Sequence, residues 1–326
     1  MTVEQIKAII KPIEQVINQQ EPTLRVLITG ASGLLGLNAS LMQASHFDIF
    51  GVVHQTHLRD VPFQLVHADL TQDGIVEKVI DQVAPDVVIN CAAMAQVDQC
   101  ELFPEEARRI NAWMPGIVAG CCDHHRIPML HISTDAVFDG KKGGYTEADI
   151  PHPQSVYAQT KLEGEERVLS ANPRSLVVRV NFFGHSLSGE RSLAEFFLHH
   201  LLNGTQVNGF VDVIFSPLYV KHLADILFVM IDKGLHGLYH VVGEEKVSKY
   251  DFGRMLAKKM SLDESLIIPA SVSDAGLKAK RSPNLFLDIS KLKAADIEIP
   301  SLQQGLDAFI ADFQTKWHVA MHAYQS

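Results

Sequence analysis

Three glycines with the spacing G-x-x-G-x-x-G follow a short apolar stretch near the start of the chain. Residues 26–28 predict a short buried strand, and residues 34–42 are compatible with a helix. Between them, Gly30 permits a sharp exit from the strand, Gly33 lets a pyrophosphate approach the backbone, and Gly36 lets the helix pack closely on the sheet. The first turn of such a helix offers unpaired N–H groups and a positive dipole end to phosphate. The spacing differs from G-x-G-x-x-G and a plain tight turn is the alternative, but the order strand, glycines, helix predicts a dinucleotide site.

Short apolar segments continue to alternate with helical ones. Strands are expected at residues 26–29, 49–53, 64–67, 86–90, 129–132 and 175–180, and helices near 34–44, 75–83, 104–122 and 155–171. This alternation predicts an α/β fold with a parallel, doubly wound Rossmann sheet and right-handed crossovers. Such sheets bind ligands at the carboxyl ends of their strands.

The alternation breaks after residue 180. Helices are expected at 193–202, 218–233 and 248–260, irregular or short strands over 207–217, and one more strand of the main sheet at 238–242. We therefore expect an NAD(P)-binding domain over 24–182, to which 211–246 returns. A smaller C-terminal α/β substrate lobe would comprise 183–210 and 247–312, followed by a tail over 313–326.

Residues 1–23 precede the first strand. Their isoleucines and valines recur at helical spacing, which predicts an amphipathic helix. Its apolar face is expected to pack on its own domain. The alternative is a partner surface, such as that of a second copy of the chain in a homodimer.

The composition excludes several classes of protein. The chain has 326 residues, of which 47% are hydrophobic, enough for one large α/β domain or two lobes. Its net charge of −10 argues against a nucleic-acid surface, which needs a basic patch. The cysteines, at 91, 100, 121 and 122, fit neither a metal-binding spacing nor a disulfide framework, so we expect no metal and a reduced, cytoplasmic protein. We also expect no signal peptide and no membrane span, because the longest apolar run, near 223–231, is far shorter than the roughly 20 residues needed.

The segment after the second expected strand bears on the choice of cofactor. Proteins that bind NAD usually carry Asp or Glu at the end of this strand, where it binds the ribose diol. Here residues 54–59 read His-Gln-Thr-His-Leu-Arg, and no acid appears before Asp60. Arg59 and the two histidines, His54 and His57, are candidates to meet a 2′-phosphate, which favours NADP(H) over NAD(H). The alternative for Arg59 is a solvated loop charge.

Tyr157 and Lys161 lie four residues apart in the helix expected at 155–171. That spacing puts both side chains on one helix face. A phenol ordinarily has a pKa of about 10, and a nearby ammonium lowers it by favouring the phenolate. Tyr157 is therefore expected to exchange a proton near neutral pH. The order of the motifs along the chain strengthens the interpretation of this pair as catalytic: the glycine loop comes first, then Ser-Thr-Asp at 133–135 at a strand end, then Tyr157 and Lys161.

In that order, these motifs resemble those of the extended short-chain dehydrogenases/reductases, and within them most closely the dTDP-4-dehydrorhamnose reductase group. That group also contains a non-catalytic relative, the regulatory β subunit of methionine adenosyltransferase. The resemblance covers about residues 24–312. The matching motifs lie at 29–36, 67–70, 90–93, 97–98 with 101, 111, 133–140, 157 with 161, 281–283 and 287–288. The run Ser-Thr-Asp-Ala-Val-Phe-Asp-Gly at 133–140 is the most specific of them.

The resemblance implies roles residue by residue. Thr134 would hydrogen-bond the substrate carbonyl, Tyr157 would donate a proton to its oxygen as the nicotinamide delivers hydride, and Lys161 would hold the nicotinamide ribose and tune Tyr157. The alternative for Thr134 is a hydroxyl that only satisfies a strand end. Besides Tyr157 and Lys161, the implied cofactor-binding residues are Gly30, Ser32, Gly33, Leu34, Leu35, Gly36, His54, Arg59, Asp69, Leu70, Cys91, Ala92, Ala93 and Asn111. The implied substrate-binding residues are Met94, Asp98, Asp135, Phe138, Asn181 and Arg281.

Arg281 lies in the most basic stretch of this acidic chain, residues 278–283. Its match to the family's Arg-Pro motif implies that it clamps the diphosphate of a nucleotide substrate, and a solvated loop charge is the alternative. The substrate lobe also departs from the family pattern. A tryptophan expected after the sixth strand is absent from 181–184, and the family's glutamine and threonine are replaced by Val213 and Leu218.

We therefore expect an NADP(H)-dependent reductase of a keto group, carried by a nucleotide-activated deoxysugar. Two alternatives stay open. One is a cofactor-bound regulatory subunit like that of methionine adenosyltransferase. The other is a sugar-nucleotide epimerase or dehydratase, which would bind NAD tightly. The missing acid after the second strand counts against the latter.

Overall fold

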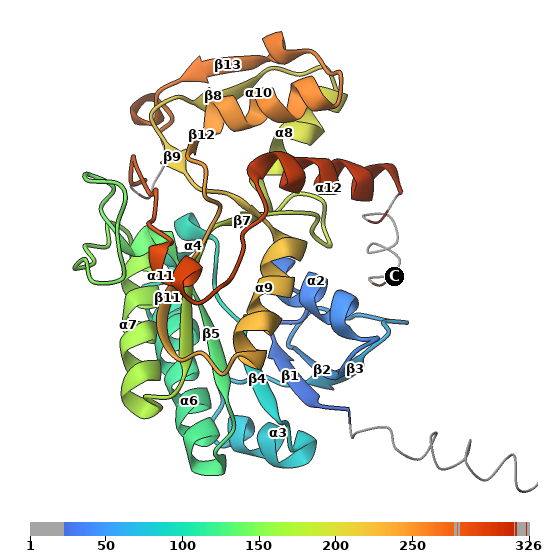
Figure 1. Cartoon of the computed structure of the whole chain (residues 1–326), viewed down its shortest axis with the longest axis vertical. Coiled ribbons are helices and arrows are strands. Elements are labelled where there is room, and N and C mark those ends of the chain that lie inside the picture. The colour runs from blue at the N-terminus through green and yellow to red at the C-terminus, as the bar shows by residue number, and fades with distance from the viewer. Residues whose placement is uncertain (1–22, 277–278, 280, 316, 318–323, 325–326) are drawn as a thin grey trace, which may run out of the picture.

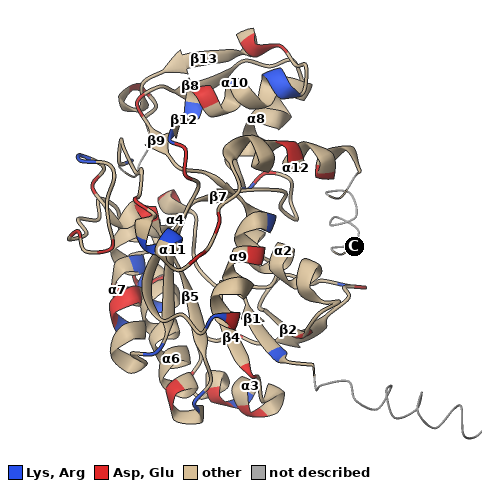
Figure 2. Ribbon diagram, in the orientation of Figure 1, with Lys and Arg blue, Asp and Glu red and all other residues tan. Residues whose placement is uncertain are grey.

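A computed structural model of the chain describes residues 23–276, 279, 281–315, 317 and 324 (Figure 1). The amphipathic helix expected over 1–23 lies outside the described residues, apart from residue 23, and so does most of the expected tail. Within the described ranges, every helix is too short or too polar to cross a lipid bilayer. Acidic and basic side chains are interspersed over both lobes (Figure 2).

Among the described residues, seven parallel strands form the central sheet, in the order β11-β6-β5-β4-β1-β2-β3. They are β1 (Arg25–Thr29), β2 (Asp48–Val53), β3 (Gln64–His67), β4 (Val87–Asn90), β5 (Met129–Thr134), β6 (Leu176–Val180) and β11 (Gly237–Val241). The strand order reverses between β1 and β4, which creates a crevice at their carboxyl ends. The doubly wound parallel sheet expected from the sequence is confirmed, and each strand begins and ends within about two residues of its expected bounds.

Helices cover both faces of this sheet, which is why its strands are apolar almost throughout. On one face lie α2 (Leu34–Gln43) and α9 (Val220–Asp232), which pack against each other. On the other lie α3 (Ile75–Val83), α6 (Met114–His125) and α7 (Val156–Ala171) (Figure 1). The alternation along β1 follows this division: Val26 and Ile28 join one buried core, and Leu27 joins the other.

The helix expected over 104–122 is interrupted. It consists of α5 (Pro104–Arg108), a π-helical turn over Arg109–Trp113 and α6, and a further short helix, α4 (Val97–Leu102), precedes it. Pro115 has no N–H to donate to the carbonyl four residues back, that of Asn111, so the regular α-helical ladder cannot continue there. That carbonyl instead approaches α7, where a Cβ on Gly164 would lie 2.2 Å from it.

The smaller lobe lies beyond the carboxyl edge of the sheet (Figure 1). Its β8 (Val207–Phe210) pairs in parallel with β13 (Ile267–Ala270), and β9 (Ile214–Phe215) pairs with β12 (Val247–Ser248). The helices α8 (Leu193–Leu202) and α10 (Lys249–Lys259) pack together beside them. A further pair, β7 (Phe182–Phe183) and β10 (Leu218–Tyr219), lies against α12 (Leu302–Gln314), a helix that the sequence patterns did not predict. The short α11 (Ser290–Ala294) packs beside β11, although its residues were expected in the lobe.

Candidate active site

The glycine turn has the conformation that its sequence requires. Gly30 has a φ of +65°, in the left-handed region, and a Cβ there would lie 2.8 Å from the backbone of Ala92. The N–H of Gly33 donates to the carbonyl of Gly30 at 2.8 Å, and no side chain caps the start of α2. The first N–H groups of α2 therefore remain available to an anion. Gly36 was expected to let the helix pack closely on the sheet, and this was wrong. An added Cβ would meet the Gly30 carbonyl at 2.3 Å, so the close approach is to the glycine turn itself.

A cavity of about 290 Å³, here called the glycine groove, opens beside this turn at the carboxyl ends of β1, β2 and β4. The predicted cofactor residues in its wall are Gly30, Ser32, Gly33, His54, Asp69, Leu70, Cys91, Ala92 and Ala93. Leu34, Leu35 and Gly36 lie in the first turn of α2, outside that wall. Asp69 accepts hydrogen bonds from the N–H and hydroxyl of Thr71, which lower the pKa of its carboxyl.

An arginine that was predicted at the glycine groove lies outside it, and an arginine that was not predicted lies in its wall. Arg59 is exposed and lies outside the wall of the groove, and its backbone N–H donates to the carbonyl of Tyr324 at 2.7 Å. Arg191, which the sequence patterns did not indicate, contributes to the wall. It precedes Ser192, which caps α8 through a capping box with Glu195. The Ser-x-x-Glu spacing could have predicted the start of that helix, but no local signal places its loop against a turn 160 residues earlier.

Asn111 is buried on the π-helical turn and holds the loop after β4. Its side-chain oxygen accepts from the N–H of Met94 at 2.8 Å, and its amide donates to the carbonyl of Met94 at 3.1 Å. The amide also donates to the hydroxyl of Thr160, the neighbour of Lys161, at 3.1 Å. Asn111 and Met94, both predicted site residues, therefore fix the loop beside the glycine groove, and neither of them lines the groove.

Thr134 and Tyr157 meet where β5 ends. Thr134 hydrogen-bonds the Tyr157 hydroxyl, accepts from the N–H of Ala136 at 3.1 Å, and donates to Asp135 at 3.2 Å. Burial raises the pKa of Tyr157 to about 12, which corrects the expectation that a nearby ammonium would lower it toward neutrality. The physical reason is that Lys161 faces elsewhere: its Nζ donates to the carbonyl of Ile132 at 2.6 Å. Burial lowers the pKa of Lys161 to about 8.

A second cavity of about 200 Å³ lies between the two lobes and is here called the inter-lobe cavity. Tyr157, Asn181 and Arg281 line it, together with Lys249, the first residue of α10. The amide of Asn181 donates to the buried carboxyl of Asp135 at 2.6 Å, and burial raises the pKa of Asp135 to about 6. Lys249 was not predicted. Burial, and then the charge of Arg281, lower the pKa of Lys249.

Two further predicted substrate residues, Asp98 and Phe138, lie outside the wall of this cavity. Asp98 pairs with Arg281 at 3.3 Å and accepts from the N–H of Ala279 at 3.0 Å, so it holds the loop that carries the arginine. Phe138 is completely buried and stacks on Tyr145, with ring centroids 4.2 Å apart. The aromatic side chain therefore belongs to the core. Its position within the Ser-Thr-Asp motif gave no sign of that.

A sequence profile described as the RmlD substrate binding domain matches residues 24–315. The chain belongs to this family. It is 33% identical over 296 residues to the probable low-salt glycan biosynthesis reductase Agl14 of Haloferax volcanii, covering 88% of this chain and 97% of the relative. It is 30% identical over 289 residues to the β subunit of methionine adenosyltransferase 2 of Danio rerio, covering 86% of this chain and 87% of the relative. The structure of Bacillus anthracis dTDP-4-dehydrorhamnose reductase in complex with NADP superposes with a TM-score of 0.80 at 26% identity, covering 89% and 100% of the two chains.

Membership of the RmlD family confirms the resemblance that the motifs indicated.

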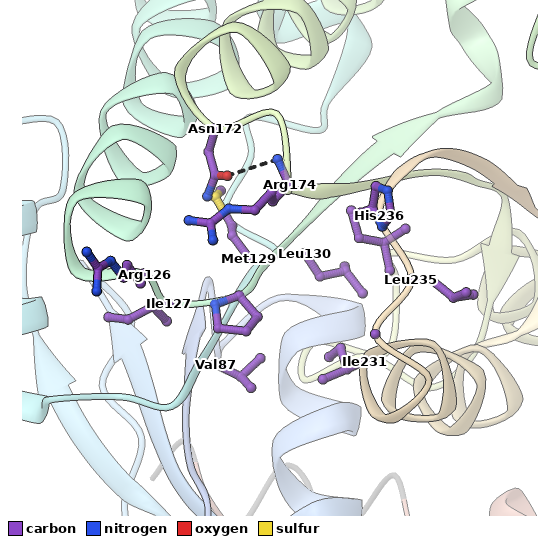
Figure 3. Close-up of a pocket in the computed structure, with 13 residues that line it drawn as sticks. Val87, Arg126, Ile127, Met129, Leu130, Asn172, Arg174, Ile231, Leu235 and His236 are labelled. Carbon is purple, nitrogen blue, oxygen red and sulfur yellow. Dashed lines mark hydrogen bonds between the residues drawn. The ribbon is translucent and has the colours of Figure 1, made fainter.

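A further cavity, of about 320 Å³, opens at the opposite edge of the sheet (Figure 3). Its wall is mainly aliphatic, also includes Arg126, Arg174 and His236, and contains none of the predicted site residues. Doubly wound sheets bind ligands at their carboxyl ends, so this cavity is not the candidate site. Within the described residues, no three His, Cys, Asp or Glu side chains cluster as a metal ion requires.

Proposed function

We propose that the chain is an NADP(H)-dependent reductase that converts the keto group of a nucleotide-activated deoxysugar, such as dTDP-4-dehydrorhamnose, to an alcohol. The position of helix α7 supports this function most strongly. On α7, Tyr157 lines the inter-lobe cavity, and one turn later the ammonium of Lys161 lies near enough to Cys91, in the wall of the glycine groove, to act on the pKa of its buried thiol. A single face of α7 therefore links a dinucleotide groove to a cavity with two cations. The Haloferax volcanii and Bacillus anthracis relatives, both described as reductases, support the same activity.

The glycine groove fits a dinucleotide on physical grounds. A side chain at Gly30 would collide with the backbone of Ala92, and the start of α2 is uncapped, so the turn leaves room and donors for a pyrophosphate. We assign the pyrophosphate to the backbone at Ser32 and Gly33, the adenine to Asp69 and Leu70, and the nicotinamide ribose to Lys161. When bound, the reduced nicotinamide supplies a hydride to the carbonyl carbon of the substrate.

The protein's own residues supply the proton. In the proposed reaction, Tyr157 donates its phenolic proton to the carbonyl oxygen, and Thr134 hydrogen-bonds the same oxygen. Because the pKa of Tyr157 is about 12, the phenol carries its proton at neutral pH, as a donor must. Lys249 and Arg281 line the same cavity and suit the diphosphate of a nucleotide sugar.

The test is oxidation of NADPH in the presence of a panel of 4-keto nucleotide sugars, with product identified by mass spectrometry. Turnover with one of them supports the reductase.

The second candidate function, a cofactor-bound regulatory subunit, draws on the Danio rerio relative and on Val213, which places an apolar side chain in the inter-lobe cavity where the family has glutamine. Tight NADPH binding with no turnover of any sugar nucleotide in the panel would favour this second function.

We predict that NADPH binds more tightly than NADH. His54, Gln55 and Thr56 follow β2 in the wall of the groove, and none of them is acidic. Of the three, only His54 can carry a positive charge. His54→Ala should weaken NADPH about tenfold or more and NADH much less, since a hydrogen bond to a charged group contributes about 1.5–3 kcal/mol. Fluorescence titration of both cofactors measures this. Arg59→Ala is the matched control, because Arg59 lies outside the groove. Equal affinities of the unmodified chain for both cofactors would contradict the prediction.

We also predict that Arg281→Lys weakens a sugar nucleotide about tenfold or more, because lysine cannot reproduce the paired hydrogen bonds of a guanidinium to phosphate. The affinity for NADPH should hardly change. Arg254→Lys is the matched control, since Arg254 lies on α10 of the same lobe and pairs with Glu264 outside the cavity. Calorimetric titration with a sugar nucleotide and with the same sugar lacking phosphate separates the two effects. Indifference of the sugar nucleotide to the substitution would remove Arg281 from the proposed site.

A further inference from the structure

Three buried polar residues form a row across adjacent strands of the sheet. Thr29 on β1 is the register partner of Asn90 on β4, and Asn90 is the partner of His131 on β5. Each side chain is at most 1% exposed. On the same face, the preceding positions are the apolar Leu27, Val88 and Met129, which contact the core beneath α3, α6 and α7. The change from apolar to polar occurs at the carboxyl edge, beside the glycine groove.

The row is joined by hydrogen bonds from end to end. The hydroxyl of Thr29 donates to Asn90 at 2.5 Å, and the amide nitrogen of Asn90 lies 2.8 Å from Nδ1 of His131. At one end, Nε2 of His131 lies 3.4 Å from Nζ of Lys161. At the other end, the N–H of Ala92, in the wall of the glycine groove, donates to the hydroxyl of Thr29 at 3.1 Å.

We propose that His131 is a positioning residue that acts through Lys161: its imidazole ties the lysine to Asn90 and Thr29, and so to the backbone of the groove. The proposal rests on the proposed role of Lys161 in holding the cofactor ribose. Lys161 is itself only 2% exposed, and within the described residues its hydrogen-bonding neighbours are His131 and the carbonyl of Ile132. An ammonium with so few partners depends on each acceptor for its charge and its direction.

An imidazole suits this position because its two nitrogens meet two partners at once. Nε2 accepts from the charged Lys161 when Nδ1 carries the proton. The carboxamide of Asn90 then turns its oxygen to Nδ1 and its amide nitrogen to the hydroxyl of Thr29, which accepts in this arrangement instead of donating. Burial, and then the charge of Lys161, keep the pKa of His131 well below its ordinary value, so the ring is neutral. The other ionisable groups that act on Lys161 are Glu165 on α7 and Cys91 after β4, and both favour its charged form.

The experiment measures the dissociation constant of NADPH against pH in the full chain. For the unmodified protein, we expect affinity to fall as pH rises through the pKa of Lys161, because the ammonium loses its proton. His131→Leu removes an acceptor from the ammonium and lowers the pKa of Lys161 further. The midpoint of the fall should therefore move to lower pH by about one unit, which is about a fivefold loss of affinity at pH 8 and approaches tenfold at higher pH.

Two further variants test the geometry. His131→Gln can still offer an oxygen toward Lys161, so it should retain the midpoint, whereas His131→Asn reaches only Asn90 and should behave as His131→Leu. His240→Leu is the control, because this buried histidine on β11 faces Arg179 instead of Lys161 and should leave the midpoint in place. Thermal melting shows that each variant is folded before it is titrated.

An unchanged midpoint in folded His131→Leu would overturn the proposal, and so would a shift of equal size in His240→Leu. The readout does not require turnover. If His131→Leu shifts the midpoint as expected but the unmodified chain reduces no keto sugar, the proposed reductase fails while the role of His131 stands. If the unmodified chain reduces a keto sugar but His131→Leu behaves as the unmodified chain does, the reverse holds.

Discussion

Tyr157→Phe is expected to lower the rate of keto-sugar reduction about 10²–10⁴-fold while the dissociation constant of NADPH stays within about twofold. The substitution removes only the phenolic oxygen, which is the proposed proton donor and hydrogen-bonds Thr134. That interaction is required in the transition state, when negative charge develops on the carbonyl oxygen, and not in the resting complex. Single-turnover kinetics with a saturating substrate measure the loss directly.

The control is Tyr250→Phe, which removes a phenolic oxygen from α10, outside the inter-lobe cavity. The pH profile adds a second check. Because the pKa of Tyr157 is about 12, its ionisation should not limit activity between pH 6 and about 10, and a fall near pH 8 should come from Lys161. Reduction at an unchanged rate by Tyr157→Phe would mean that another group donates the proton.

Glu165→Ala is expected to reduce the free energy of unfolding by about 3–5 kcal/mol, because it leaves the buried guanidinium of Arg179 without its counterion. Arg179 on β6 donates three hydrogen bonds to the carboxylate of Glu165 on α7: from Nη2 at 2.7 Å and from Nε at 3.0 and 3.2 Å. Both side chains are under 5% exposed, and the hydroxyl of Ser133 also donates to this carboxylate. Urea denaturation followed by circular dichroism measures the change.

The matched control lies half a turn away on the same helix. Glu163 pairs with Arg108 and Arg167 at the surface, where both arginines are about half exposed, so Glu163→Ala should cost about 1 kcal/mol or less. The double replacement Glu165→Leu with Arg179→Leu should recover part of the loss, since it removes the buried charge altogether. A loss for Glu165→Ala no larger than for Glu163→Ala would show that the buried pair does not stabilise the fold.

The sheet could be predicted from the sequence because its signals are local. Each strand is a short apolar run bounded by polar residues, and the glycine turn specifies its own backbone through Gly30. The π-helical turn was missed because Pro115 is tolerated in the first turn of a helix as readily as it breaks one, so its position alone does not distinguish the two outcomes.

The candidate site could be predicted only in part. Residues carried by motifs, such as Tyr157 and Asp69, lie in the walls of the two cavities, and their roles there stay predictions. Arg191 and Lys249 were missed because each reaches its cavity from the smaller lobe, and no short-range pattern records which lobe surface faces which strand end. The expected drop in the pKa of Tyr157 was wrong because helical spacing places Lys161 on the same face but does not show that its ammonium turns toward β5.

The pairing of β8 with β13 restricts how the substrate preference of this protein can be exchanged with that of a relative. These partners lie about 60 residues apart in sequence, and between them the chain returns to the central sheet through α9 and β11. A chimera with one crossover point between these strands would pair a β8 from one parent with a β13 from the other, across a parallel interface that occurs in neither parent. Recombination designs should therefore transplant residues 193–215 and 247–274 together and leave the intervening helix and strand in the recipient.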